Sequence, residues 1–528
     1  MCGIAGIISK PNNADINISK LVNEMLELIS HRGRGELGIK TGNNYSLGCY
    51  RLPVLTNGGE QPVSNELKSI FAVLNGEIYN YNELIDSLKL KHTIKGDCDT
   101  VILPHLYEEG ELSLRKLSGM YALCVHDTVS NETVLMRDLI GIKPLYIFEN
   151  NFFIAFASEK KAFSYLNHGK VSEVMPGELL RLKHGLITSR ANIVKPWNKS
   201  LVKGNYQSVD YTGLRDEITN SLIQQLPSEW PVAVLCSGGI DSVILTYLAK
   251  KYHKHNVQAY VIGNENSADV KAARLACHHL DVNLKEIRIS MEEIIKVLPE
   301  VIYHVESFES NLIRNSILSY LVFREIRKDG FRVAICGEGA DELFAGYGDF
   351  RLLSSIIEKQ KFMKLLLDDL FKTQLQRVDR TSMAFNVETR VPFLDDNVIE
   401  YACNIPIEKK CGKDFGRWLS KLPLRHAFAN TQIPTEILLR QKETFSSGAG
   451  LGDLSMVGGP IEKIAQSRIS SNEFISMQSK YPVIDIKTYE QALYLSEYLK
   501  YFFVPEDYRP PVVATVELSC LSGFETEK

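Results

Sequence analysis

Hydrophobic positions follow two different patterns in the two halves of this chain. Before about residue 190, apolar runs of strand length dominate, and only a few stretches show helical spacing. Strands are expected over residues 4–8, 47–50, 71–74, 120–126, 133–136 and 152–157, and helices over 21–29 and in the stretch that ends at 108. Hairpins of such strands with helices inserted between them predict stacked sheets covered by helices.

The second half instead alternates strands with helices, which predicts a parallel sheet wound with helices. The strands expected here are residues 232–236, 257–262, 284–289 and 333–336, and the chain is mainly helical after 343. The polar, aperiodic residues 191–212 are expected to link two domains, 2–190 and 213–505, with a loose tail at 506–528. The predicted fold class is therefore α/β, in two domains.

Composition excludes several classes of function. The chain has 528 residues, 45% hydrophobic and 23% charged, with a formal net charge of −4, so neither nucleic acid nor an anionic membrane is expected as a partner. No apolar run reaches transmembrane length, and no signal peptide precedes the fold. The ten cysteines form no Cys-x-x-Cys pair, which points to a reducing, cytoplasmic location and against zinc.

A glycine-containing loop with the sequence SGGIDS, residues 237–242, follows the apolar run 232–236 and precedes a helix expected over 243–252. Strand, glycine turn and helix start together form an anion site, because backbone N–H groups and the helix dipole converge there. Ser237 and Ser242 can add hydroxyl donors, and Asp241 can hold the magnesium ion that accompanies a nucleotide. The alternative is an ordinary capped glycine turn. The loop lacks the lysine of a P-loop, and it resembles the loop of enzymes that split ATP into AMP and pyrophosphate.

A second loop follows another expected strand, 333–336. It reads GEGADE over residues 337–342 and carries three carboxylates in five residues. Ligands of wound parallel sheets bind at the carboxyl ends of the strands, where both loops are expected. The loop is therefore either a solvated turn or a site for metal binding and intermediate handling.

The N-terminal residues offer a nucleophile. Removal of Met1 would expose Cys2, whose own α-amine could then act as the base for its thiol. That amine has a reference pKa of about 7.7–8.0, suited to accepting a proton near neutrality. A cysteine at this position also occurs by accident, so the assignment depends on other segments.

One such segment is Asn75-Gly76, directly after the strand expected at 71–74. Asparagine followed by glycine typically forms a tight turn, and this alternative stays open. The functional interpretation is an oxyanion hole made by the Asn75 amide and the Gly76 N–H. Asp97 and Asp99 further along are either helix-capping acids or binding residues.

Together, Cys2 with the following GIAG, the segment at Arg51, Asn75-Gly76-Glu77 and Gly96-Asp97 resemble a class II glutamine amidotransferase domain. The resemblance implies an αββα Ntn-hydrolase sandwich, with Cys2 as the nucleophile. It implies that Arg51 binds the carboxylate of glutamine and that Glu77 and Asp97 bind its amino group. The full set implied to bind glutamine is Arg51, Leu52, Pro53, Val54, Leu55, Asn75, Gly76, Glu77 and Asp97. Residues 32–35 depart from the family, reading RGRG where RGPD is usual.

With the two glycine-containing loops, residues 379–384, 388–395 and 440–445 resemble the glutamine-hydrolysing asparagine synthetase family, to about residue 505. The resemblance implies an ATP-pyrophosphatase domain that joins aspartate to AMP and amidates the ester. It implies magnesium at Asp241 and Asp341, intermediate handling by Glu338 and charge neutralisation by Lys442. The residues implied to bind ATP are Leu235, Ser237, Gly238, Gly239, Asp241, Ser242, Ile262, Cys336 and Gly337.

The identity of the acid depends on a segment that departs from the family. Residues 311–314 read NLIR where many members have two threonines, although Arg314, a natural carboxylate partner, is retained. Amidation of a different acid is therefore the nearest alternative, and a non-catalytic binding protein with the same fold is a second. A β-lactam-forming relative is disfavoured because that branch lacks the Cys2 glutaminase. The expected partners are the small molecules glutamine, aspartate and ATP, with a homodimer left open.

Overall fold

The computed structural model describes residues 2–11, 16–52, 59–96, 98–166, 168–200, 209–441, 448–449 and 459–504. The chain divides into two compact units. The first consists of residues 1–195 with 382–388, and the second of residues 196–381 with 389–528. Each unit is described by itself.

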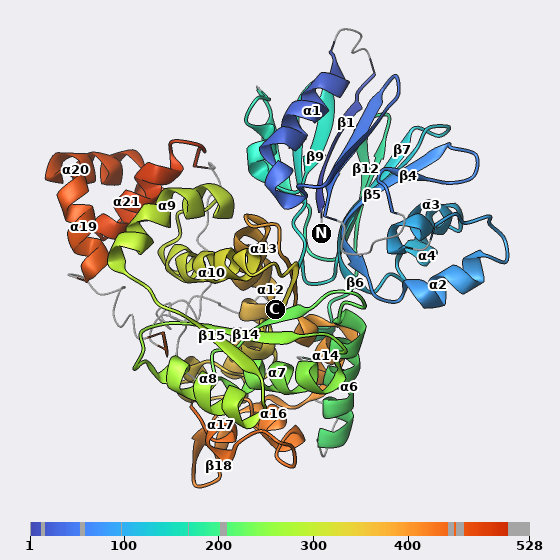
Figure 1. The fold of residues 1–528 in the computed structure, drawn as a ribbon. Coiled ribbons are helices and arrows are strands. Elements are labelled where there is room, and N and C mark those ends of the chain that lie inside the picture. The colour runs from blue at the N-terminus through green and yellow to red at the C-terminus, as the bar shows by residue number, and fades with distance from the viewer. Residues whose placement is uncertain are drawn as a thin grey trace. The chain divides into compact units, whose positions relative to one another are not determined.

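The first unit contains two six-stranded sheets (Figure 1). One has the order β10-β8-β9-β1-β3-β2, and the other β12-β11-β7-β6-β5-β4. All the strand pairs described in these two sheets are antiparallel. The strands are β1 Cys2–Ser9, β2 Glu36–Thr41, β3 Tyr45–Arg51, β4 Val63–Ser64, β5 Ile70–Ile78, β6 Gly119–Asp127, β7 Glu132–Arg137, β8 Tyr146–Glu149, β9 Phe153–Ala157, β10 Lys170–Glu173, β11 Glu178–Lys183 and β12 Leu186–Asn192.

Helices cover the outer faces of these sheets. Figure 1 shows α1 beside β1 and β9, whereas α2, α3 and α4 lie next to β5 and β6. The helices and 3-10 turns are α1 Ile18–Leu28, η1 Ser30–Arg32, α2 Tyr81–Leu88, η2 Asp99–Ile102, α3 Leu103–Glu108, α4 Glu111–Leu114 and η3 Lys160–Phe163. The layers are therefore helix, sheet, sheet and helix, as the resemblance implied.

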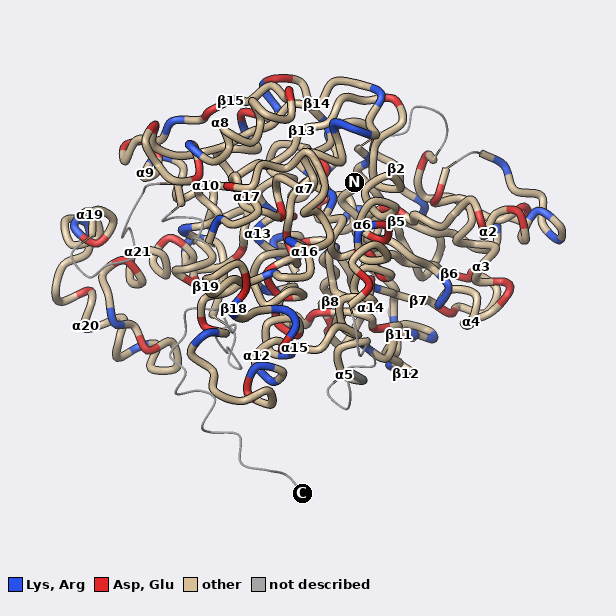
Figure 2. The backbone as a smooth tube through the Cα atoms, turned by 90° about the horizontal axis from the view of Figure 1, so that it is seen from below, with Lys and Arg blue, Asp and Glu red and all other residues tan. Residues whose placement is uncertain are grey.

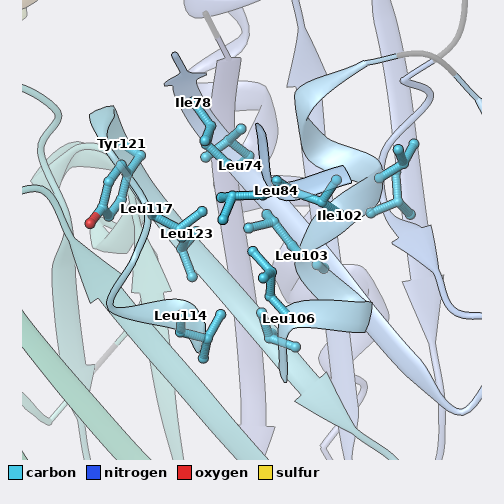
Figure 3. Close-up of a cluster of buried hydrophobic side chains, with 14 of the residues drawn as sticks. Leu74, Ile78, Leu84, Ile102, Leu103, Leu106, Leu114, Leu117, Tyr121 and Leu123 are labelled. Atoms are coloured by element: carbon cyan, nitrogen blue, oxygen red, sulfur yellow. The ribbon is translucent and has the colours of Figure 1, made fainter. Parts of the chain in front are cut away.

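Three hydrophobic clusters hold the four layers together. Because side chains alternate along a strand, β5 serves two of them. Phe71 and Val73 join the cluster between the sheets, whereas Leu74 joins the cluster beneath α2 and α3. Figure 3 shows this second cluster, in which Leu103 and Leu106 of α3 lie among leucines from the sheet. A third cluster packs α1 on the other sheet.

The second unit is built on a five-stranded sheet with the order β15-β14-β13-β16-β17. The pairs β13–β14, β14–β15 and β13–β16 are parallel. The chain proceeds from β13 outward to β15 and then returns to the other side of β13, so the order reverses between β13 and β16. Ligands of such sheets bind outside the carboxyl ends of the strands at this switch point. The strands are β13 Val232–Leu235, β14 Val257–Ile262, β15 Asn283–Ile287, β16 Val333–Ile335 and β17 Glu388–Arg390, with a separate hairpin of β18 Gly412–Asp414 and β19 Arg417–Leu419.

Helices make up most of the rest of this unit (Figure 1). They are α5 Pro196–Ser200, α6 Tyr211–Gln225, α7 Ile240–Tyr252, α8 Ala268–His279, α9 Met291–Val305, α10 Ser310–Lys328, α11 Ala340–Leu343, α12 Ile356–Asp369, α13 Gln374–Met383, α14 Asp396–Asn404, α15 Ile407–Lys410, α16 Leu422–Ala427, α17 Thr435–Leu438, α19 Pro460–Arg468, α20 Ser471–Lys480 and α21 Tyr489–Tyr498. Short 3-10 turns are η4 Gly348–Arg351, η5 Leu370–Lys372, η6 Pro392–Leu394 and η7 Pro482–Ile484.

The differences from expectation have local causes. The strand expected over 71–74 continues to Ile78, so Asn75-Gly76 lies within β5 and the turn alternative is wrong. Pairing with β6 extends along the whole strand and overrides the turn preference of the dipeptide. Part of the expected linker is helical, because α5 occupies residues 196–200. Strand β17 is only three residues long, too short to give a periodic signal.

Charged residues of both signs are spread along the described chain. Figure 2 shows basic and acidic residues interspersed along the described chain rather than gathered into blocks of one sign. Among the described residues, no helix combines the length and apolar character needed to cross a membrane. The cysteines of the described part are all free of disulfides.

Candidate functional site

Strand register brings the predicted nucleophile to the interior between the two sheets of the first unit. On β1, Cys2 shares its face with Ile4 and Ile8, which point into the inter-sheet cluster. On β5, Asn75 follows Phe71 and Val73 at the period of two that points to the same cluster. The residues therefore meet because each occupies an inward-facing position.

Asn75 is fully buried and uses only one side of its amide. Its Oδ1 accepts a hydrogen bond from the Cys2 backbone N–H at 3.2 Å. Its Nδ2 has no hydrogen-bond partner and lies away from solvent. A buried donor without a partner is costly and uncommon in folded proteins. Next to a nucleophile, such a donor can stabilise an oxyanion.

The surroundings of the Cys2 thiol favour its ionised form. A hydrogen bond from the Cys49 thiol lowers the pKa of Cys2 to about 7, and the Leu52 N–H acts in the same direction against the opposing effect of burial. Gln61 Nε2 lies 3.7 Å from Cys2 Sγ, and the Gln61 amide is held by the backbone of Leu74. A thiolate is the reactive form of cysteine, so this environment activates Cys2 near neutral pH.

The segment at residues 32–35 contributes an anchor for Cys2. Arg32 is fully buried, and its Nε donates to the Cys2 carbonyl oxygen at 3.2 Å. Its Nη1 pairs with Glu159 at 2.7 Å, and His31 contacts the same carboxylate. Arg32 and Glu159 therefore fix the backbone of the nucleophile, whereas Arg34 is exposed and outside this network.

Arg51 and Gly76 complete the cluster on the strands. Arg51 stands directly opposite Cys2 in the β1–β3 register, and its Nη1 lies 3.1 Å from Glu36. Gly76 has a φ of +144°, and a side chain there would collide with the Met120 carbonyl of β6. Glu77 is half-buried at the end of the same strand. The remaining predicted glutamine-binding residues, Pro53, Val54, Leu55 and Asp97, lie outside the described residues.

In the second unit, the SGGIDS loop joins β13 to α7 at the switch point. Gly238 has a φ of +73°, and a side chain there would collide with Ala272 of α8. The Ser237 and Ser242 hydroxyls lie 3.4 Å apart, and the Gly239 N–H points at Ser237 Oγ at the same distance. Helix α7 begins at Ile240, so its N-terminus faces this loop. Hydroxyls, backbone N–H groups and helix dipole therefore converge as an anion site requires.

Asp241 and Asp341 converge on a residue that the sequence motifs did not indicate. The Nζ of Lys421 lies 3.0 Å from Asp241 and 2.8 Å from Asp341. Lys421 is 1% exposed and precedes α16, whereas the two carboxylates follow β13 and β16. The carboxylates from the two sides of the switch point thus share one cation.

Other acids of the second loop are also paired. Glu338 Oε1 lies 2.5 Å from Arg377 Nη2 of α13. Burial, with the nearby charge of Asp341, raises the pKa of Glu342 to about 7, and the Tyr347 hydroxyl donates to this carboxyl at 2.5 Å. The three acids of this loop therefore have three different environments, which a solvated turn would not provide.

The residues implied to contact a nucleotide lie at the ends of adjacent strands. Leu235 ends β13, Ile262 ends β14, and Cys336 with Gly337 follow β16. Arg440 joins them from a distant segment: its Nη1 donates to the Ser237 carbonyl oxygen at 3.1 Å, and its Nη2 contacts Asp269 at 2.6 Å. Lys442, two residues later, lies outside the described residues.

Arg314 is held by an acid of the chain itself. Its Nε donates to Oε1 and its Nη2 to Oε2 of Glu490 on α21, each at 2.8 Å. Its Nη1 donates to Asn311 Oδ1 at 2.9 Å. Glu490 is buried and also accepts from the Tyr494 hydroxyl. The guanidinium fork that was predicted to bind the substrate acid is therefore engaged within the protein.

Several residues at these sites had no role predicted from the sequence. Gln61, Arg32, Lys421 and Arg440 each come from a segment remote from the group they contact. For Glu159 a signal existed, because the charged residues 159–161 begin two positions after the end of the apolar strand β9. For Lys421 no local signal distinguishes a buried cation from the many exposed ones.

In comparisons with known proteins, both halves of the chain match known families. A family model described as glutamine amidotransferase domain matches residues 1–214, and one described as asparagine synthase matches residues 213–366 and 358–497. A putative glutamine-hydrolysing asparagine synthetase of Methanocaldococcus jannaschii is 32% identical over 84% of this chain and 86% of that protein. Asparagine synthetase 3 of Arabidopsis thaliana is 32% identical over 95% and 88%, and asparagine synthetase B of Escherichia coli 30% identical over 96% and 92%.

Among solved structures, a glutamine phosphoribosylpyrophosphate amidotransferase from B. subtilis matches with a TM-score of 0.30 and 15% identity. The match covers 64% of this chain and 81% of that one.

Proposed function

This chain belongs to the glutamine-hydrolysing asparagine synthetase family, and from that membership we propose that it makes asparagine from aspartate. Ammonia comes from glutamine in the first unit, and ATP activates the acid in the second. One observation carries the proposal: in each unit, residues of separate motifs meet at a single site. Cys2 meets Asn75 in the first, and Asp241 meets Asp341 through Lys421 in the second.

In the first unit, Cys2 attacks the side-chain amide of glutamine, the C–N bond breaks with release of ammonia, and water then hydrolyses the resulting thioester to glutamate and free Cys2. The negative charge that develops on the carbonyl oxygen is stabilised by donors already in place. Asn75 Nδ2 is suited to this role because it is buried and has no other partner. The thiolate is favoured by Cys49 and the Leu52 N–H, and Arg32 holds the backbone of the nucleophile.

In the second unit, the acid attacks the α-phosphate of ATP, pyrophosphate leaves, and ammonia displaces AMP from the acyl-adenylate. The SGGIDS loop would bind the pyrophosphate, since hydroxyls, N–H groups and the start of α7 converge there. Arg440 supports the loop by a hydrogen bond to the Ser237 carbonyl oxygen. Glu338, Lys442 and the adenosine contacts retain the roles that the family resemblance implies.

The donor set at the switch point suits Mg²⁺, which prefers carboxylate oxygens and substrate phosphates. Asp241 and Asp341 would hold it, and both oxygens already face a cation in Lys421. When bound, the ion would neutralise charge on the phosphates. Before the nucleotide binds, the charge of Lys421 would offset the electrostatic repulsion between the two carboxylates.

A second candidate is amidation of a different acid. Two observations favour it: residues 311 and 312 are Asn and Leu where many members of the family have threonines, and the Arg314 fork is engaged by Glu490. Both candidates share the chemistry of the two units. They differ only in the pocket for the acid.

The test is incubation with ATP, Mg²⁺ and glutamine and a panel of acids, with AMP and amide products identified. Aspartate-dependent release of AMP together with asparagine supports the proposal. Release of AMP with another acid and none with aspartate would select the second candidate. A homodimer and a cytoplasmic location belong to the same proposal, and light scattering of the purified protein tests the first.

A further inference from the structure

Four side chains remote from Cys2 gather on one side of the first unit. Glu66 follows the short strand β4, His92 follows α2, and His105 and Glu108 lie one turn apart on α3. One ligand atom from each lies within 4.8 Å of every other. Neither the amidotransferase residues nor the resemblance accounts for this cluster.

The distances match the edges of a metal coordination tetrahedron. His105 Nδ1 lies 3.5 Å from Glu66 Oε2 and 3.4 Å from Glu108 Oε2. His92 Nδ1 lies 3.5 Å from Glu108 Oε2 and 4.0 Å from Glu66 Oε1. Zinc bonds of about 2.0–2.2 Å to nitrogen and oxygen place neighbouring tetrahedral ligands roughly 3.3–3.6 Å apart. The three distances that join the two Nδ1 atoms to Glu66 Oε2 and Glu108 Oε2 fall within that range, whereas the 4.0 Å distance is to the other oxygen of Glu66.

Outer partners occupy the other polar atoms of three of these residues. Asn65 donates to Glu108 Oε1 at 3.0 Å, which leaves Oε2 facing the cluster. His92 Nε2 contacts Glu109 at 3.2 Å, which leaves Nδ1 facing the cluster. The Thr93 N–H donates to Glu66 Oε1. Metal-binding histidines and carboxylates are typically oriented by such contacts, and a carboxylate is one of the usual partners of a histidine's second nitrogen.

The buried ring nitrogen of His105 also points to a ligand, independently of the distances. This residue is 2% exposed, and its Nδ1 has no hydrogen-bond partner although it points at the two carboxylates. A buried ring nitrogen in that state costs free energy unless something else satisfies it. A cation between His105, Glu66 and Glu108 would accept its lone pair and separate the two acids.

We propose that Glu66, His92, His105 and Glu108 bind a divalent transition metal ion, with zinc the best match. Two imidazoles and two carboxylates are ligands that zinc accepts, and two carboxylates balance its charge. Four protein ligands leave no open position, so the site is structural rather than catalytic. The scattered cysteines gave no hint of it because the ligands are histidine and glutamate.

The site would join three segments that are separate in sequence. Helix α3 packs through Leu103 and Leu106 against the cluster that includes Leu74 of β5, next to Asn75 (Figure 3). The ion would tie this helix to the turn after β4 and to the segment after α2. Its effect is therefore expected on the stability of the first unit.

The experiment uses the full-length protein after treatment with a chelator. Zinc is titrated in competition with a chromophoric chelator, and thermal unfolding is followed with and without zinc. We expect one equivalent of tightly bound zinc and a higher unfolding temperature. The spectrum of the cobalt(II) form should show tetrahedral coordination without a thiolate charge-transfer band.

Variants at partly exposed ligands avoid the risk that a His105 variant does not fold. His92→Gln and Glu108→Gln should abolish the tight site, and Glu109→Gln should weaken it about ten- to a hundredfold as an outer partner. His278→Gln, at an exposed position of α8, is the matched control and should bind like wild type. Zinc binding that is absent, unchanged in the ligand variants or accompanied by a thiolate band would overturn the proposal.

Discussion

The two candidate sites are built in opposite ways. Around Cys2, pairing of strands sets the positions of Cys2, Cys49 and Asn75, and Cys2 and Asn75 are 5% and 0% exposed. At the switch point, loops at strand ends carry the residues, and the side chains of Asp241 and Asp341 are each 13% exposed. The first site depends on register and burial, and the second on the balance of charge. A single substitution should therefore inactivate one site and leave the activity of the other intact.

The difference also sets what each site needs from its ligand. Asn75 Nδ2 is a neutral donor that is already in position, so the first site is organised before glutamine binds. The second site holds two carboxylates that Lys421 keeps together. A negatively charged nucleotide enters such a site only if further cations accompany it. Variants that act on one site alone test this contrast.

The largest effect is expected from Cys2→Ala. Without the thiol no thioester forms, so glutamine-dependent amide synthesis should fall to background. Synthesis driven by added ammonium should stay near the wild-type rate, because the second site is untouched. Both rates are measured as AMP release. If ammonium-driven synthesis also disappeared in a folded variant, the two sites would not be separable.

Asp241→Asn makes the converse change. It removes one charge from the pair at Lys421 while the shape of the side chain is kept. We expect loss of ATP-dependent synthesis with both nitrogen sources, whereas glutamate release from glutamine persists. The readouts are AMP and glutamate in the same reaction. Wild-type synthesis would show that Asp241 is not needed to bind the metal–nucleotide complex.

Asn75→Ala should reduce glutaminase kcat by about 10²–10³, the effect of removing one oxyanion donor. KM should change less, because the missing contact is made chiefly in the transition state. Asn404→Ala, which removes an amide from the end of α14, is the matched control. A rise in KM with unchanged kcat would instead assign Asn75 to ground-state binding of glutamine.

The contrast between the sites also explains how far the sequence could be interpreted. Residues 71–74 and 4–8 are apolar throughout, so they predict buried strands but do not indicate which side chains face the inter-sheet core. Only the family resemblance brought Cys2 and Asn75 together before the structure was known. The extension of β5 through Gly76 could not be predicted, because it depends on pairing with β6. In the second unit, by contrast, the strands β13 to β16 and the loops after them were predicted, and the predicted strand ends differ from the observed ones by at most two residues.

The counter-charges could not be predicted. Arg32, Lys421 and Arg440 act on groups that lie far from them in sequence, and nothing local shows which groups they contact. A sequence motif contains mainly the residues that contact the ligand. The residues that neutralise those groups are selected by the three-dimensional packing.

Arg314→Ala separates two roles of the buried arginine. If Arg314 binds the acid, a lost charge-assisted bond of about 1.5–3 kcal/mol weakens acid binding roughly ten- to a hundredfold, with KM for ATP unchanged. Glu490→Gln is the companion variant, since it releases the same fork. If Arg314 only fixes α21, both variants should destabilise the protein alike and leave KM for the acid near wild type after correction for folded enzyme.

The smallest effect concerns pH. Cys49 and the Leu52 N–H lower the pKa of Cys2 to about 7, so the thiolate fraction rises as pH rises through 7. Glutaminase kcat/KM, which reports groups of the free enzyme, should therefore be roughly tenfold lower at pH 6 than on its plateau above pH 8. Glutamate release must be the readout, because Glu342, with a pKa raised to about 7, titrates in the other site. Cys49→Ala removes the main hydrogen bond, so it should move the midpoint of the profile to higher pH. An unchanged midpoint in that variant would mean that another group, such as the α-amine, controls the profile.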